Sequence, residues 1–163
     1  VMQLPIIFIC ENNLYSSHLD IHLRQTSNMV SRFAKAHNIR TNLVDGNDVL
    51  AVSRAMKEAV DLSRTQCVPT FIEAVTFRWR GHVGPNDDID VGLHRSMEQL
   101  IAWKATDPIE RLLATGEKID AKFRKYCRKK ADLIDGELMS DSLSARKAEY
   151  PDKASLLQFV YEN

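Results

Sequence analysis

Three short apolar segments, separated by stretches with helical periodicity, constrain the fold of this 163-residue chain more than any other feature. They lie at residues 4–10, 39–44 and 70–77. The first is apolar on both faces, as an interior strand of a parallel sheet is, and the third is rich in β-branched and aromatic residues. Residues 27–37 and 49–64, which separate them, place apolar side chains at helical spacing. Strands alternating with helices of this length predict right-handed crossovers and an α/β fold built on a parallel sheet with flanking helices.

The remainder of the chain is predicted to be helical. Asn47 or Asp48 can cap the helix that follows the second strand, and Asp107 can cap a helix at 108–115 that ends at Gly116. Further helices are expected at 96–105 and over an amphipathic segment at 117–149, interrupted at Gly136 and stopped by Pro151. We expect residues 1–96 to form part of the α/β domain and residues 97–163 to form a helical C-terminal region packed on it. Because Val1 leads almost at once into a buried-looking strand, we also expect a preceding part outside this sequence.

The charge balance excludes several classes of protein. Lys and Arg number 22 and Asp and Glu number 22, so the chain lacks the basic excess of a dedicated nucleic-acid or anionic-membrane binder. The longest apolar run, at 4–10, is far shorter than the roughly 20 residues that span a bilayer. The three cysteines are odd in number and contain no Cys-x-x-Cys pair, which predicts a reducing compartment such as the cytoplasm.

Ligands of parallel α/β sheets bind outside the carboxyl ends of the strands, so the loops at 11–17 and 78–96 are the candidate site. Asn12 and Asn13 in the first loop offer amide oxygens of the kind that magnesium accepts. An Asn-rich turn held by local side-chain hydrogen bonds explains the same residues without a metal.

The second loop contains Arg78 and His82, which can donate hydrogen bonds to phosphate oxygens, and the histidine can also move protons near neutral pH. The alternative is a polar loop pinned by ion pairs to Asp87, Asp88 and Asp90. This acidic group could itself hold a divalent cation, although a solvated acidic loop is the better interpretation.

Other patterns favour ordinary surface roles. His18 and His22 lie four residues apart without the glutamate of a helical zinc motif, so they are interpreted as surface histidines. The basic residues at 122–130 lie on a helix with an apolar stripe and are interpreted as a solvated face. No Gly-x-Gly-x-x-Gly or Walker loop is present, so the chain lacks a phosphate cradle of its own.

Four ordered motifs identify a resemblance that extends over the whole chain. They are LPIIFICENNLYS, VDGNDVLAV, PTFIEAVTFRWRGH and WKATDPIERL. In this order and spacing they resemble the alpha subunit of the thiamine diphosphate-dependent decarboxylating component of 2-oxo acid dehydrogenase complexes, the family of pyruvate, branched-chain and acetoin dehydrogenases. The resemblance covers the C-terminal half of that subunit. It implies that residues 1–96 are the C-terminal part of a thiamine diphosphate-binding domain.

The resemblance also implies roles for individual residues. Asn13 would supply a side-chain oxygen to magnesium beside the cofactor diphosphate, and Tyr15 would supply its backbone carbonyl to the same ion. His82 resembles the active-site histidine of the family, near the diphosphate and the substrate, and Arg78 matches an arginine of the same loop. The family's Gly-Asp-Gly, whose aspartate also binds magnesium, would lie before Val1.

The implied partners and reaction complete the expectation. A beta subunit would complete the site in an alpha2beta2 heterotetramer. A small 2-oxo acid would be decarboxylated and its acyl unit passed to a lipoyl-bearing acyltransferase, and neither nucleic acid nor membrane would be bound. Val83 stands where many relatives carry a regulatory serine, and residues 84–88 and 94–95 depart from the family loop, so the 2-oxo acid stays open. A truncated or split half acting as a non-catalytic subunit-interaction module, or a helical interaction module at 117–149, remains an alternative.

Overall fold

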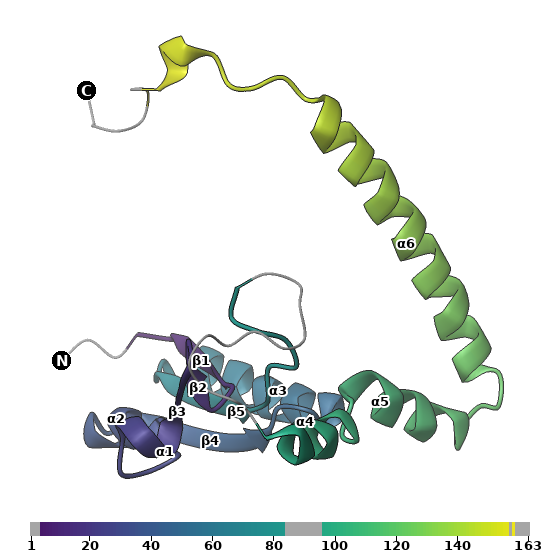
Figure 1. Ribbon diagram of the computed structural model, residues 1–163. Helices are drawn as coiled ribbons and strands as arrows, with labels where there is room; N and C mark the ends of the chain where they lie inside the picture. Colours follow the sequence, from purple (N-terminus) through teal and green to yellow (C-terminus); the bar gives the residue numbers. More distant parts are fainter. Residues whose placement is uncertain (1–3, 84–95, 157, 159–163) are drawn as a thin grey trace. The chain divides into compact units, whose positions relative to one another are not determined.

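The computed structural model describes residues 4–83, 96–156 and 158 (Figure 1). The chain divides into two compact units, Val1–Thr115 and Gly116–Asn163. The described elements are β1 (Ile7–Asn12), β2 (Tyr15–Ser16), β3 (Leu19–Asp20), α1 (Ile21–Arg24), α2 (Ser31–Ala36), β4 (Arg40–Asp45), α3 (Val49–Gln66), β5 (Thr70–Val75), α4 (Met97–Lys104), α5 (Pro108–Glu117), α6 (Phe123–Lys147) and a 3-10 turn at Lys153–Ser155. The expected domain boundary at residue 96 stays a prediction.

The first unit contains the predicted parallel sheet. Its described strands lie in the order β1-β5-β4, and β5 is parallel to both neighbours. The register sets Asn12 and Asp45 on either side of Val75, so all three strands end at the same edge. This arrangement, with helices beside the sheet, confirms the α/β fold class. The loops that leave this carboxyl edge are therefore neighbours in space, although they are far apart in the sequence.

Alternation along β5 assigns different helices to the two faces of the sheet. Ile72 is 2% exposed and packs with Ala55 and Ala59 of α3, which forms the core on that face. The next residue, Glu73, points to the opposite face and meets the N-terminus of α2. α2 therefore lies on the face of the sheet opposite α3.

Strand β1 differs from its sequence expectation in bounds and in burial. It covers Ile7–Asn12 rather than residues 4–10, because its ladder with β5 runs on to the carbonyl of Asn12, which accepts from the Thr76 N–H at 3.0 Å. Among the described residues β1 pairs only with β5. Phe8 and Ile9 are consequently 43% and 56% exposed. The strand that the sequence predicts to be interior thus lies at an edge of the described sheet.

Helix ends follow the predicted local signals where those signals act alone. Asp48, one of the two predicted candidates, accepts from the Leu50 and Ala51 N–H groups and so caps α3. Asp107 accepts from the Ile109 N–H at the start of α5, which confirms that cap. Asn38 adopts a left-handed conformation, with φ of 57°, just after α2, as is common for the residue that follows a helix C-terminus.

The start of α2 was predicted wrongly at residue 27. The helix begins at Ser31, because the backbone N–H groups of Val30 and Ser31 bond to the carboxylate of Glu73, more than forty residues away in the sequence. The start of this helix is therefore set by tertiary structure and not by a local cap.

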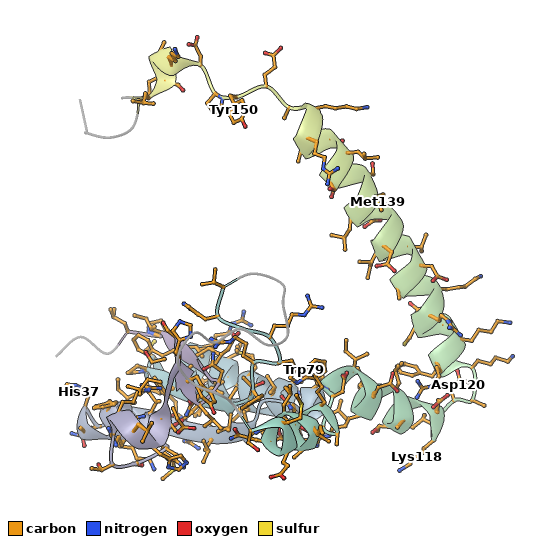
Figure 2. The ribbon with its side chains drawn as sticks, viewed as in Figure 1. His37, Trp79, Lys118, Asp120, Met139 and Tyr150 are labelled. Carbon is orange, nitrogen blue, oxygen red and sulfur yellow. The ribbon has the colours of Figure 1, made fainter. Side chains whose placement is uncertain are left out.

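The second unit is dominated by α6, whose side chains project outward along the helix (Figure 2). The predicted interruption at Gly136 is wrong, because the helix runs unbroken through that residue to Lys147. The chain breaks before α6 instead, where the Asp120 side chain accepts from the Lys122 N–H at 2.8 Å. Ile119, which falls within the segment predicted to form this helix, therefore lies outside it and is 86% exposed. No helix among the described residues is long and apolar enough to cross a membrane.

Two glycines should respond oppositely to replacement by alanine. At Gly46 a Cβ atom would lie 2.8 Å from the carbonyl oxygen of Val75, and the Gly46 N–H already donates to that oxygen at 2.7 Å. Gly46→Ala should lower the free energy of unfolding by about 1–3 kcal/mol, because the backbone must move to admit the methyl group. Urea unfolding followed by tryptophan fluorescence measures this effect, since Trp79 and Trp103 both lie in the first unit.

The matched control is Gly136→Ala, where a Cβ atom meets nothing within 4 Å. Alanine should stabilise α6 by up to about 1 kcal/mol relative to glycine, so the variant should keep more of its helicity than the parent chain on heating. Equal stability of Gly46→Ala and the parent chain would mean that the approach of Gly46 to Val75 imposes no constraint.

Candidate functional site

The turn that leaves β1 is built from two overlapping side-chain hydrogen bonds. Asn12 Oδ1 accepts from the Leu14 N–H at 3.1 Å, and Asn13 Oδ1 accepts from the Tyr15 N–H at 3.0 Å. Leu14 takes a left-handed conformation with φ of 67°, and its carbonyl accepts from the Ile21 N–H. The Asn-rich turn considered in the sequence is therefore present. An amide oxygen has two lone pairs, so this turn is compatible with a cation ligand at Asn13.

An aromatic cluster holds the segment after β5 beside this turn. Phe77 is buried, stacks on Trp103 of α4 at 5.4 Å between ring centroids, and meets the edge of Tyr15 at 5.8 Å. The Tyr15 hydroxyl donates to Gln99 Oε1 at 3.2 Å. Offset aromatic contacts of this kind stabilise by about 0.5–1.5 kcal/mol beyond the area that they bury. Tyr15 thus anchors the first loop to Phe77, just before the second loop, and to α4.

Arg78 joins the two loops directly. Its Nη2 donates to the carbonyl of Ser17 at 2.9 Å, and its Nε donates to the carbonyl of Arg80 at 3.0 Å. Its Nη1 lies 3.3 Å from Nδ1 of His82. Because a guanidinium only donates, this contact is a hydrogen bond when His82 carries its ring proton on Nε2. The predicted pair of Arg78 and His82 is therefore brought together at the carboxyl edge.

His18 was given no role in the sequence but lies against this pair. The ring of His18 is 6.0 Å from the ring of His82 and almost perpendicular to it. The antiparallel pairing of β2 with β3 turns the chain back at His18. The spacing of His18 and His22 gives no sign of this contact, because it depends on a hairpin too short to be predicted. His22 lies instead on α1, with Nε2 3.4 Å from the side-chain nitrogen of Asn28.

The donor set fits a diphosphate bearing a hard cation. Amide and backbone carbonyl oxygens, as at Asn13 and Tyr15, suit magnesium, which keeps several water and phosphate ligands of its own. The Arg78 guanidinium and the His82 imidazole suit phosphate oxygens. Within the described parts of the chain no three histidine, cysteine or acidic side chains cluster as a metal site. Asp87, Asp88 and Asp90, considered as an alternative cation site or as ion-pair partners, lie outside the described residues.

The candidate site is distinct from a nearby apolar hollow of about 570 Å³. This hollow lies between β4 and α4, and its lining residues are Leu43, Val44, Asp45, Val75, Ala102, Trp103 and Thr106. None of the residues predicted for the cofactor lines it. The carboxyl edge itself is braced on this side by Arg111, which donates to Asp45 at 2.7 Å and to the Asn47 carbonyl at 3.0 Å.

A fully buried carboxylate lies beneath the turn after β1. Glu73 is 0% exposed and accepts hydrogen bonds from the Val30 and Ser31 N–H groups and from the Asn12 side chain. Burial raises the pKa of Glu73, but these hydrogen bonds lower it by more, so the pKa lies below its ordinary value. The neighbouring Cys10 thiol has a raised pKa, caused by burial and then by the Glu73 charge. Sequence analysis did not single out Glu73, because its partners come from distant segments.

The lowered pKa of Glu73 predicts how stability depends on pH. The ionised carboxylate stabilises the fold above its ordinary pKa of 4.5, and this contribution is lost as pH falls through the lower value of the folded state. At pH 7 Glu73→Gln should be less stable by about 1–3 kcal/mol, because glutamine leaves a buried donor unmatched. Melting temperatures measured between pH 7 and pH 3 should show the difference between the parent chain and Glu73→Gln becoming smaller below pH 4.5. A difference that stays constant with pH would contradict a lowered pKa for Glu73.

The fold and this cluster of donors define an α/β protein whose candidate site lies where parallel strands end. Residues 1–122 match the family described as Dehydrogenase E1 component. The chain belongs to the dehydrogenase E1 component family, which confirms the resemblance found in its sequence.

Several relatives of the chain are named as alpha subunits of pyruvate or 2-oxoisovalerate dehydrogenases. The chain is 38% identical over 111 residues to the pyruvate dehydrogenase E1 component subunit alpha of Porphyra purpurea, a match that covers 68% of this chain and 31% of that protein. It is 30% identical over 172 residues to the mitochondrial 2-oxoisovalerate dehydrogenase subunit alpha 1 of Arabidopsis thaliana, a match that covers 99% of this chain and 34% of that protein. It is 29% identical over 161 residues to 2-oxoisovalerate dehydrogenase subunit alpha of Bacillus subtilis, which covers 99% of this chain and 48% of that protein. The chain thus spans about a third to a half of these relatives.

Proposed function

We propose that this chain supplies the alpha-subunit side of a thiamine diphosphate- and magnesium-dependent site that decarboxylates a 2-oxo acid. The observation that carries the proposal is the Arg78–His82 pair, tied through the Ser17 carbonyl to the loop that contains Asn13 and Tyr15. These residues follow two adjacent parallel strands, at the edge where α/β sheets bind ligands.

Each residue has a role that its chemistry suits. The amide oxygen of Asn13 and the backbone carbonyl of Tyr15 bind magnesium, while Arg78 binds the diphosphate. His82 binds the diphosphate as well and, as the catalytic residue, donates or accepts a proton at the substrate. When bound, thiamine diphosphate supplies the nucleophilic carbon and the electron sink for decarboxylation. The substrate is pyruvate or a related 2-oxo acid, and the acyl unit passes to the lipoyl group of an acyltransferase.

The partner in this proposal is a beta subunit in an alpha2beta2 heterotetramer, which is located in the cytoplasm or in the mitochondrial matrix. Several relatives are alpha subunits by name, which supports a partner subunit. The exposed apolar side chains of β1, Phe8 at 43% and Ile9 at 56%, also support coverage by further protein. The free thiols of Cys10, Cys67 and Cys127 are consistent with a reducing compartment.

Calorimetric titration tests the proposal. The isolated chain should bind thiamine diphosphate with magnesium more weakly than micromolar, because the beta subunit that would complete the site is not present in this measurement. The alpha subunit containing this sequence, purified with its beta subunit, should bind both tightly and decarboxylate a 2-oxo acid. Failure of the assembled protein to bind thiamine diphosphate would overturn the proposed function.

A second candidate is a non-catalytic subunit-interaction module. The observation in its favour is the exposed apolar surface of α6, where Leu133, Ile134, Leu138, Met139 and Leu143 are each at least 50% exposed. Under this function the chain would co-purify with a partner, yet the assembled protein would bind no cofactor. The titration of the assembled protein therefore separates the two candidates.

A further inference from the structure

Glu73 makes more contacts than the capping of α2 requires. Its Oε2 accepts from the Ser31 N–H at 2.7 Å, and its Oε1 accepts from the Val30 N–H at 2.9 Å. These two bonds provide acceptors for the Val30 and Ser31 N–H groups at the start of the helix. Oε1 also accepts from Asn12 Nδ2 at 2.7 Å, which links the carboxylate to the end of β1. Glu73 and Asn12 are 0% and 4% exposed, so water does not substitute for this bond.

The third contact, together with a bond to the Asn28 carbonyl, determines which way the Asn12 amide points. An ionised carboxylate has only acceptors, so it selects the NH₂ end of the amide. The same nitrogen also donates to the Asn28 carbonyl at 2.9 Å. The amide oxygen is thereby turned toward the Leu14 N–H, from which it accepts a hydrogen bond at 3.1 Å. A reversed amide would present a donor to that N–H and open the turn.

We propose that Glu73 is a positioning residue for the turn that leaves β1, where Asn13 would bind magnesium. Glu73 acts through Asn12 to hold the backbone that presents Asn13. The inference rests on the proposed function for its consequence in metal binding. Its structural part, the control of the Asn12–Leu14 hydrogen bond by Glu73, stands independently. Glu73 touches neither cofactor nor substrate in this role.

Glu73→Gln is the direct test, because the side chains have the same shape but glutamine has one acceptor oxygen for three donors. Hydrogen exchange of the Leu14 amide, measured in the full chain without cofactor, should quicken at least about tenfold. In the assembled enzyme the magnesium concentration for half-saturation at excess thiamine diphosphate should rise about tenfold. The matched control is Ile72→Val on the opposite face of β5, which should lower the melting temperature and leave both readouts unchanged. If Glu73→Gln does not fold, Glu73→Asp takes its place, because its carboxylate is drawn back by one methylene. It should likewise quicken Leu14 exchange and raise the magnesium concentration for half-saturation.

A double-mutant cycle with Asn12→Ala separates positioning from general destabilisation. If Glu73 acts through Asn12, the double variant should need about as much magnesium as Asn12→Ala alone. The inference would be overturned if the double variant raised the magnesium requirement by the product of the two single effects. Unchanged hydrogen exchange of the Leu14 amide in Glu73→Gln would overturn it as well. If the assembled wild-type enzyme binds no magnesium with thiamine diphosphate, the proposed function fails, and the Leu14 readout then decides the positioning by itself.

Discussion

His82→Ala should lower turnover of the assembled enzyme at least about a hundredfold, within the range that one general acid or base contributes. This corresponds to about 2.7 kcal/mol in the activation barrier. His82 is exposed, its described contacts are with Arg78 and His18, and neither of these belongs to the hydrophobic core. The melting temperature should therefore stay within about a degree of the parent, as is expected of a loop residue.

Decarboxylation and acyl transfer to a lipoylated acceptor measure this effect. His37→Ala is the matched control, because His37 is also exposed but lies at the end of α2, outside the proposed site. The control should retain normal turnover. Near-normal turnover of His82→Ala would remove His82 from the catalytic machinery and leave it as a partner of Arg78.

Asn13→Ala should weaken the binding of thiamine diphosphate with magnesium at least about tenfold, or about 1.4 kcal/mol. The variant removes an oxygen ligand, and magnesium tolerates little distortion of its octahedron. It also removes the bond to the Tyr15 N–H, which loosens the carbonyl proposed as the second ligand. Asn13→Asp keeps an oxygen at this position and should bind more tightly than the alanine variant.

Titration of the assembled enzyme with cofactor at fixed magnesium measures the change. Asn42→Ala on β4 serves as control, because it removes an amide of similar burial outside the proposed site. Its affinity for cofactor should equal that of the parent. If Asn13→Ala also binds cofactor normally, Asn13 forms a local turn and holds no metal.

Part of the candidate site follows from local sequence. Asn13 and Tyr15 end up in one turn because Asx hydrogen bonds act over two residues. Arg78 and His82 lie in one short non-helical segment, so their contact is a local one. The proposed ligand roles of these residues stay predictions. Neither His18 nor Glu73 could be found in this way, since the contacts of each come from a hairpin or a distant strand.

By itself, the sequence determined the α/β class, the order of the main strands and helices, the cap at Asp107, and a cap at either Asn47 or Asp48. These depend on periodicity and on bonds within three residues, which are present in the chain before it folds. Only the tertiary structure decided where β1 ends and where α2 begins. Both depend on bonds to β5, namely the Thr76 N–H and the Glu73 carboxylate, and no local pattern encodes a partner sixty or forty residues away.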